Sequence, residues 1–150
     1  MVKPLFALIL LAASWPALSD EITYSKHIRP VWEDKCGRCH DSSAPDYATF
    51  MKNPKQYELD DKGPRMDSYA TLLYFVSSRE EAGAMMRRLD DGSNTKDGQP
   101  GNMYRHLGRK EERAENLKLF KKWIGEDAWS MKKTAEYTEE DLRRIKAKQE

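Results

Sequence analysis

The sequence is poor in cysteine, in histidine and in long apolar runs. Its 150 residues include two cysteines and three histidines, which excludes a fold stapled by several disulfides. Beyond residue 19 no stretch is apolar enough for a transmembrane helix, which needs about 20 such residues. An excess of one charge is missing as well, because 26 Lys and Arg stand against 25 Asp and Glu. This balance argues against a nucleic-acid binder, which would carry a basic stripe.

The length and composition indicate one small domain. A chain of this length is close to the commonest domain size, and 34% charged with 39% apolar residues leaves a modest core. Such a core is lean for a domain stabilised by its side chains alone. It suffices for a domain built around a large apolar cofactor, because the cofactor adds buried surface of its own.

The first 19 residues have the pattern of an export signal. Lys3 supplies a positive start, residues 5–13 form an apolar run, and Ala17 and Ser19 place small residues where a signal peptidase reads the chain. We expect cleavage before Asp20, a periplasmic location and a mature chain without a membrane span. An uncleaved membrane anchor is the alternative, although the run is shorter than the about 20 residues that cross a bilayer.

Cys36 and Cys39 are followed at once by His40, in the order Cys-Gly-Arg-Cys-His. In an oxidising compartment two cysteines can form a disulfide or a thioredoxin-like redox pair. The same order is also typical of c-type haem attachment. Two thiols one helical turn apart can add to the vinyl groups on one porphyrin edge, and the next histidine then falls under the iron. We therefore predict one covalent haem c on Cys36 and Cys39, with His40 as the proximal axial ligand.

Two other interpretations of these residues are weaker. A structural zinc site needs four ligands, commonly in separated pairs, and His27 and His106 have no further cysteines beside them. A thioredoxin-like pair needs a strand and a helix around it. Residues 24–35 are instead typical of a turn and a short helix, and no βαβ pattern follows.

The second axial ligand decides between electron transfer and an open iron site. Met103 is our candidate, because a neutral thioether on a flexible stem suits iron and favours Fe(II). Gly101 lets the preceding backbone pass close over a haem face. The rivals are Met66, Met85, Met86 and His106, whereas His27 is expected to be a surface or capping residue. Candidate partners for the haem propionates are Arg65, Arg87 and Arg88, and the aromatics expected near the ring are Trp32, Tyr69 and Trp123.

Local signals predict an all-α fold. Asp67 and Ser68 form an N-cap pair for a helix over residues 69–76, and a second helix is expected over residues 79–89. Turn formers and helix breakers predict irregular structure over residues 41–67 and 93–101.

The last core helix is expected over residues 111–124, where Leu117, Phe120, Trp123 and Ile124 recur at helical spacing. Beyond Gly125 the composition becomes more charged and predicts a C-terminal extension, with a short polar helix capped by Thr138 and running to Lys148. The sequence is compatible with two roles for this extension, a solvated tail and a segment that clamps a partner protein. We expect a signal peptide over 1–19, a cytochrome c domain over 20–125 and the extension over 126–150.

The sequence resembles the class I c-type cytochromes. The segment 24–32, with its Ile-Arg-Pro-Val-Trp run, and the motif at 36–40 are similar to the approach to the haem site in bacterial members. Residues 100–103, Pro-Gly-Asn-Met, and the helix ending in Trp-Ile-Gly at 123–125 resemble the family's methionine loop and C-terminal helix. The resemblance covers residues 22–125 and implies a class I cytochrome c fold. The chain departs from the family in having no long helix before the motif and a long segment after it.

These features imply electron transfer. With protein ligands on both sides, the iron changes its geometry little between Fe(II) and Fe(III). We expect a carrier, or an electron-transfer subunit of a larger oxidoreductase, rather than an enzyme in itself. Its partners are donor and acceptor proteins and not nucleic acid. The alternatives are an open-site haem protein acting as a gas sensor or peroxidase, and a disulfide protein without haem.

Overall fold

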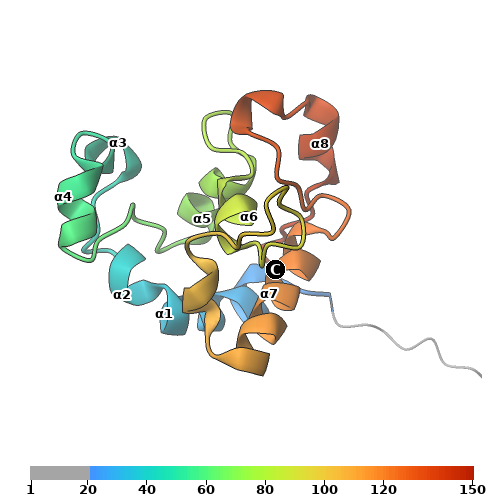
Figure 1. The fold of residues 1–150 in the computed structure, drawn as a ribbon, viewed down its shortest axis with the longest axis horizontal. Coiled ribbons are helices and arrows are strands. Elements are labelled where there is room, and N and C mark those ends of the chain that lie inside the picture. The colour runs from blue at the N-terminus through green and yellow to red at the C-terminus, as the bar shows by residue number, and fades with distance from the viewer. Residues whose placement is uncertain (1–20) are drawn as a thin grey trace, which may run out of the picture.

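The computed structural model describes residues 21–150, and all regular structure in that range is helical (Figure 1). The all-α prediction is confirmed, whereas the predicted export signal lies outside the described residues. No helix in the described range is long and apolar enough to cross a membrane. The elements in chain order are η1 (Tyr24–Ile28), α1 (Arg29–Lys35), α2 (Gly37–His40), α3 (Tyr47–Phe50), α4 (Pro54–Leu59), α5 (Tyr69–Ser77), α6 (Ala84–Leu89), η2 (Tyr104–Leu107), α7 (Lys110–Ile124), η3 (Thr134–Glu136) and α8 (Glu139–Arg144).

The chain enters the core through η1 and α1, which follow each other directly. Pro30 lies in the first turn of α1. Backbone N–H groups there have no acceptor within the helix, so the absence of an N–H in proline costs no helical hydrogen bond. Tyr24, Ile28 and Trp32 face inward and are 6%, 0% and 5% exposed. α1 ends at Lys35, so the residues of the haem motif follow it immediately.

The prediction of irregular structure over residues 41–67 is wrong in part, because this segment contains the short helices α3 and α4. Asp46 caps α3 by accepting a hydrogen bond from the Thr49 N–H at 2.8 Å, and Pro54 starts α4. Figure 1 shows both helices at the left, beside the rest of the molecule. Helices of four and six residues are too short to show a hydrophobic period, so the sequence pattern did not reveal them.

α5 agrees with the prediction, whereas α6 is shorter than predicted. Ser68 and Thr71 form a capping box at the start of α5. The second predicted helix, residues 79–89, is helical only from Ala84 onward, and residues 79–83 form turns. The cause is the left-handed backbone of Gly83, whose φ of 73° interrupts a helix.

α7 supplies the centre of the core. Leu117, Phe120, Trp123 and Ile124 are each at most 4% exposed, as their spacing predicted. Gly125, with a φ of 110°, ends the helix. α7 packs against η1 and η2, so it supports both the start of the described chain and the turn that follows Met103.

Residues 126–150 fold back over the core. The carbonyl of Lys148 accepts hydrogen bonds from the backbone N–H of Tyr24 at 2.9 Å and from the indole of Trp123 at 2.8 Å. Ala147 donates its N–H to the carbonyl of Trp123 at 2.8 Å and is 2% exposed. The end of the chain therefore ties η1 to α7 rather than extending into solvent.

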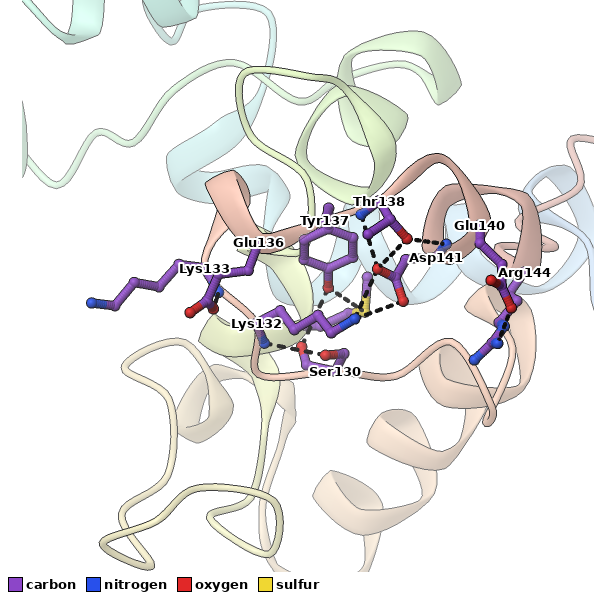
Figure 2. A network of polar contacts seen from close by, with 10 residues as sticks. Ser130, Lys132, Lys133, Glu136, Tyr137, Thr138, Glu140, Asp141 and Arg144 are labelled. Atoms are coloured by element: carbon purple, nitrogen blue, oxygen red, sulfur yellow. Dashed lines mark hydrogen bonds and ion pairs between the residues drawn. The ribbon is translucent and has the colours of Figure 1, made fainter.

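The polar helix expected in this segment is α8, and it is capped as predicted. The Thr138 hydroxyl accepts the Asp141 N–H at 3.2 Å, and the Asp141 carboxylate accepts the Thr138 N–H at 2.9 Å. Figure 2 shows Lys132 completing this arrangement, with Nζ at 2.8 Å from both Asp141 oxygens. α8 ends at Arg144 instead of Lys148, because Lys146 and Ala147 donate their backbone N–H groups to carbonyls of α7 rather than to their own helix.

Candidate functional site

Cys36, Cys39 and His40 lie within one tight turn at the start of the site. The backbone N–H groups of Cys39 and His40 both donate to the carbonyl of Cys36, each at 3.1 Å. The two thiols are free and half-buried. The three side chains that the motif predicts for haem attachment therefore project from one helical turn.

The thiol chemistry of the pair does not suit a redox-active disulfide. Burial, with a smaller contribution from Cys39, raises the pKa of the Cys36 thiol to about 12. Reactive cysteines of redox proteins have lowered pKa values, since the thiolate is the nucleophile. No strand occurs over residues 21–150, so the strand–helix context of a thioredoxin-like pair is missing there too.

His40 is buried, at 8% exposed, and its ring is held in one orientation. Nδ1 lies 2.7 Å from the carbonyl oxygen of Pro64. A carbonyl only accepts, so Nδ1 carries the proton and Nε2 keeps its lone pair, as a metal-binding histidine requires. Gly63 lies against the ring so closely that a Cβ there would overlap it. Burial lowers the pKa of His40, which favours the neutral, ligating form.

Trp32 gives an independent indication that these residues fit a haem. Its ring centroid lies 5.8 Å from that of His40. Its indole N–H is buried and finds no hydrogen-bond acceptor among the described residues, which is rare for a buried donor. Two free thiols, an imidazole with an available Nε2 and an aromatic wall beside it are the donor set and surroundings that a c-type haem uses. Over residues 21–150 no cluster of His, Cys, Asp or Glu offers a separate metal site.

Met103 lies at the start of η2, on a loop that is tied to the end of α6. Its N–H donates to the carbonyl of Arg88 at 2.9 Å, and the N–H of Gly101 donates to the carbonyl of Asp90 at 2.8 Å. The side chain of Met103 is partly buried against the core. The predicted ligand loop is thus an ordered part of the fold.

The rival ligands have other surroundings. Met66, Met85 and Met86 are buried in the core, at 8%, 5% and 0% exposed. His106 is exposed, and its Nε2 accepts a hydrogen bond from Arg105 at 3.1 Å. His27 accepts the N–H of Thr23 on Nδ1 at 3.1 Å, in keeping with the capping role predicted for it.

The motif and the methionine loop face the same region. Burial is the main cause of the lowered pKa of His40, and the charges of Arg88 and His106 lower it further. The backbone carbonyl of Arg88 accepts the N–H of Met103, and His106 lies in η2, the turn that directly follows Met103. The two predicted axial ligands therefore come from elements that approach each other.

The three arginines considered for the propionates differ in their surroundings. Arg87 is engaged by the carbonyls of Ala82 and Lys132, at 3.0 and 2.6 Å, and by the Thr134 hydroxyl at 3.2 Å. It therefore joins α6 to the C-terminal segment. Arg65 lies 3.8 Å from Asp67. Arg88, on the side of α6 that carries the Met103 loop, is exposed.

Sequence reasoning missed the residues that orient the site. Gly63 and Pro64 were recognised only as turn formers, although they hold the His40 ring. Asp90 and Trp129 belong to no recognisable sequence motif, although the indole N–H of Trp129 donates to the carboxylate of Asp90 at 2.9 Å. A buried acidic residue at the end of a helix has no signature in one sequence, because its donors come from distant positions.

Comparisons with known proteins agree on one family. The family model described as PccH cytochrome c matches residues 23–149. The solved structure of the monoheme cytochrome PccH from Geobacter sulfurreducens is 41% identical, with a TM-score of 0.75, and the alignment covers 85% of this chain and 98% of that one. A search of curated proteins found no match. The family match includes most of residues 126–150, while the boundary expected at Gly125 stays a prediction.

Proposed function

The chain belongs to the PccH cytochrome c family, and on that basis we propose that it carries electrons in the periplasm with a haem held by His40 and Met103. Membership implies one covalently bound haem c and electron transfer through it. The attachment through Cys36 and Cys39, the two axial ligands and the periplasmic location are our proposal. The haem supplies a one-electron iron couple, and the chain supplies the ligands and surroundings that tune it.

The orientation of His40 is the observation that carries the proposal. The Pro64 carbonyl accepts a hydrogen bond from the Nδ1–H of His40 at 2.7 Å, so Nε2 is the nitrogen available to iron. Gly63 and Trp32 confine the ring on two sides. Cys36 and Cys39 precede it within one turn, which is the spacing that two thioether links to one porphyrin edge require.

Met103 is proposed as the second ligand because its loop is fixed and its thioether is neutral and soft. The Arg88 carbonyl holds its backbone at 2.9 Å. A ligand already in place on each side limits rearrangement when the iron changes oxidation state, and methionine favours Fe(II) relative to a second histidine. Both effects suit a carrier that exchanges single electrons with donor and acceptor proteins and breaks no substrate bond.

The test is the visible and near-infrared spectrum of the haem-loaded protein, compared with that of Met103→Ala. We expect low-spin haem and a weak sulfur-to-iron charge-transfer band in the ferric wild type, and loss of that band in the variant. Met51→Ala is the matched control, because Met51 lies at the end of α3 and is 52% exposed. Its spectrum should equal that of the wild type.

Two outcomes would contradict the proposal. A wild type without the band, binding carbon monoxide freely in the ferrous state, would favour the open-site alternative of gas sensing or peroxide chemistry. A band that persists in Met103→Ala and disappears in Met66→Ala would assign the ligand to Met66.

The periplasmic location rests on residues 1–19 and needs its own experiment. We expect the mature protein in the periplasmic fraction, with its N-terminus at Asp20. Replacing Leu8 and Leu10 by Asp breaks the apolar run without touching the mature chain, and should leave uncleaved protein without covalent haem. Cleaved, haem-loaded protein from that variant would contradict the export proposal.

A further inference from the structure

Asp90 is a buried acidic side chain that the proposed electron transfer does not use. It follows directly after α6, is 0% exposed and is the only buried Asp or Glu over residues 21–150. A carboxylate without water costs free energy unless hydrogen-bond donors replace the solvent. Its donors therefore show what the group holds together.

Four donors meet the two carboxylate oxygens of Asp90. Oδ1 accepts the backbone N–H of Gly92 at 2.9 Å and that of Asn94 at 3.3 Å. Oδ2 accepts the side-chain amide of Asn94 at 2.8 Å and the indole N–H of Trp129 at 2.9 Å. Burial by itself would raise the pKa of Asp90, but these bonds outweigh it and the pKa lies below its ordinary value. The group is ionised at neutral pH.

The same residue starts and closes the loop that leads to Met103. Its side chain holds the first turn of that loop through Gly92 and Asn94, and its carbonyl accepts the N–H of Gly101 at 2.8 Å. A side chain at position 101 would overlap the carbonyls of Arg87 and Arg88, so the last residues of the loop lie directly on the end of α6. Both ends of the loop are therefore anchored at one place.

Trp129 is the donor to Asp90 that comes from outside the loop. It lies in the segment after α7, and its ring is further held by Lys121, whose Nζ is 5.4 Å from the ring centroid. Figure 1 shows the loop after α6 beside the chain that follows α7. Trp129 thus connects the Met103 loop to the C-terminal segment.

We propose that Asp90, bound by Trp129, is a positioning residue that keeps Met103 in place as an iron ligand. This inference rests on the proposed ligation by Met103. Asp90 acts through the loop, since its bonds restrain the backbone that carries the thioether. Removing the Trp129 bond should let the loop open while the helices stay folded, so that the methionine leaves the iron more often.

The experiment uses the full-length, haem-loaded protein and removes one side-chain hydrogen-bond donor of residues 126–150 at a time. Trp129→Phe removes the donor to Asp90. Thr134→Val is the matched control, because its hydroxyl also ties residues 126–150 to the rest of the chain, by donating to the Ala82 carbonyl at 3.1 Å. The sulfur-to-iron band of the ferric protein is followed with temperature beside the far-ultraviolet signal of the helices. Imidazole is titrated as a probe that binds iron when Met103 has left it.

In Trp129→Phe we expect the band to disappear at a lower temperature than the helical signal. Imidazole should bind about tenfold more tightly than to wild type, as fits the loss of one hydrogen bond to a charged group. In Thr134→Val the band and the helical signal should disappear together, with wild-type imidazole affinity. Asn94→Ala changes an exposed residue and removes a second donor to Asp90, so it should behave like Trp129→Phe even if that variant folds poorly.

Two results separate failure of this inference from failure of the proposed ligation. If wild type shows the band, and both Trp129→Phe and Asn94→Ala keep it until the helices melt, Asp90 does not position the ligand although Met103 binds iron. If wild type lacks the band, the proposed ligation itself is wrong and the inference falls with it.

Discussion

The Nδ1–H of His40 donates a hydrogen bond to the carbonyl of Pro64 at 2.7 Å. The two residues are far apart in the sequence, and the segment between them holds α3 and α4. Two further bonds bring the ends of that segment together, from the Gly63 N–H to Cys39 at 2.9 Å and from the Met66 N–H to the His40 carbonyl at 2.9 Å. Residues 63–66 therefore form a brace that decides which ring nitrogen is free for a metal.

Gly63→Ala should disturb this brace. The added methyl group would overlap the His40 ring, so the ring must move or the 63–66 backbone must shift. We expect a loss of about 1–3 kcal/mol in the free energy of unfolding, the usual cost of overpacking. A changed low-spin ferric spectrum should accompany it. Chemical denaturation and visible spectroscopy of the haem-loaded protein measure both effects.

Gly37→Ala is the control for that substitution. Gly37 starts α2 in the same motif, and no atom outside its immediate chain neighbours lies near the position of an added Cβ. Its spectrum should stay unchanged, and its stability should change by no more than about 1 kcal/mol. Equal effects of the two substitutions would contradict the role given to the brace.

Deleting residues 145–150 should destabilise the whole domain. The deletion removes the buried Ala147 and the carbonyl of Lys148, which bonds both Tyr24 and Trp123. It also removes the acceptor of the Tyr69 hydroxyl, the carbonyl of Ala147, at 2.9 Å. We expect a loss of about 3–5 kcal/mol, measured by denaturant unfolding, because several buried bonds break together.

The matched control for the deletion is Lys146→Ala. Lys146 lies in the same segment and forms a 3.9 Å ion pair with Asp127, in which both side chains are more than half exposed. Exposed pairs of this kind contribute about 0–1 kcal/mol. A deletion no more costly than Lys146→Ala would support the solvated tail that the sequence left open.

The parts of the fold that were predictable carry local signals. Ser68 caps α5 within four residues of chain, and Leu117, Phe120 and Ile124 show their shared face through spacing alone. The motif at residues 36–40 is local for the same reason, since its chemistry requires neighbouring residues. Each of these features is decided within a few turns of helix.

The features that escaped prediction depend on distant residues. Trp129 reaches Asp90 across 39 positions, and Tyr24 bonds the other end of the chain at Lys148. The charge and polarity of residues 126–150 indicated a solvated or partner-binding extension, yet its backbone bonds and Ala147 fasten it to the core. Composition predicts whether a segment is polar, but it does not show where its backbone hydrogen bonds go.

Substituting the cysteines should separate covalent from axial attachment. Cys36→Ala and Cys39→Ala should each keep haem through the remaining thioether, because either thiol alone can still add to one vinyl group. The double substitution should lose haem on a denaturing gel stained for haem, since these are the chain's only cysteines. Haem that stays with the double variant after denaturation would contradict attachment through this motif.

The pH dependence of stability offers a test of the Asp90 network that needs no ligand exchange. The pKa of Asp90 lies below its ordinary value of 3.8, because its four hydrogen bonds outweigh its burial. A carboxyl with a lowered pKa in the folded state stabilises the fold above its unfolded pKa, and this contribution is lost as pH falls through the folded pKa. The free energy of unfolding should therefore fall below about pH 4.

Asp90→Asn removes this titration, and comparison with the wild type separates it from the titration of more distant groups. Asp91 and Asp141 also have lowered pKa values, mainly through bonds to Ser93 and Lys132, and the nearby Lys121 pairs with Asp91 at 4.0 Å. Asp141 titrates alike in both proteins and cancels in the difference between them, whereas the charge of Asp90 raises the pKa of Asp91 in the wild type alone and so adds a smaller contribution of its own. At neutral pH the variant should be about 2–3 kcal/mol less stable, because an amide cannot accept all four donors. That difference should shrink as the wild type is acidified, since protonated Asp90 also loses acceptor capacity. A difference that stays constant down to the pH at which both proteins unfold would mean that the charge of Asp90 does not hold the loop.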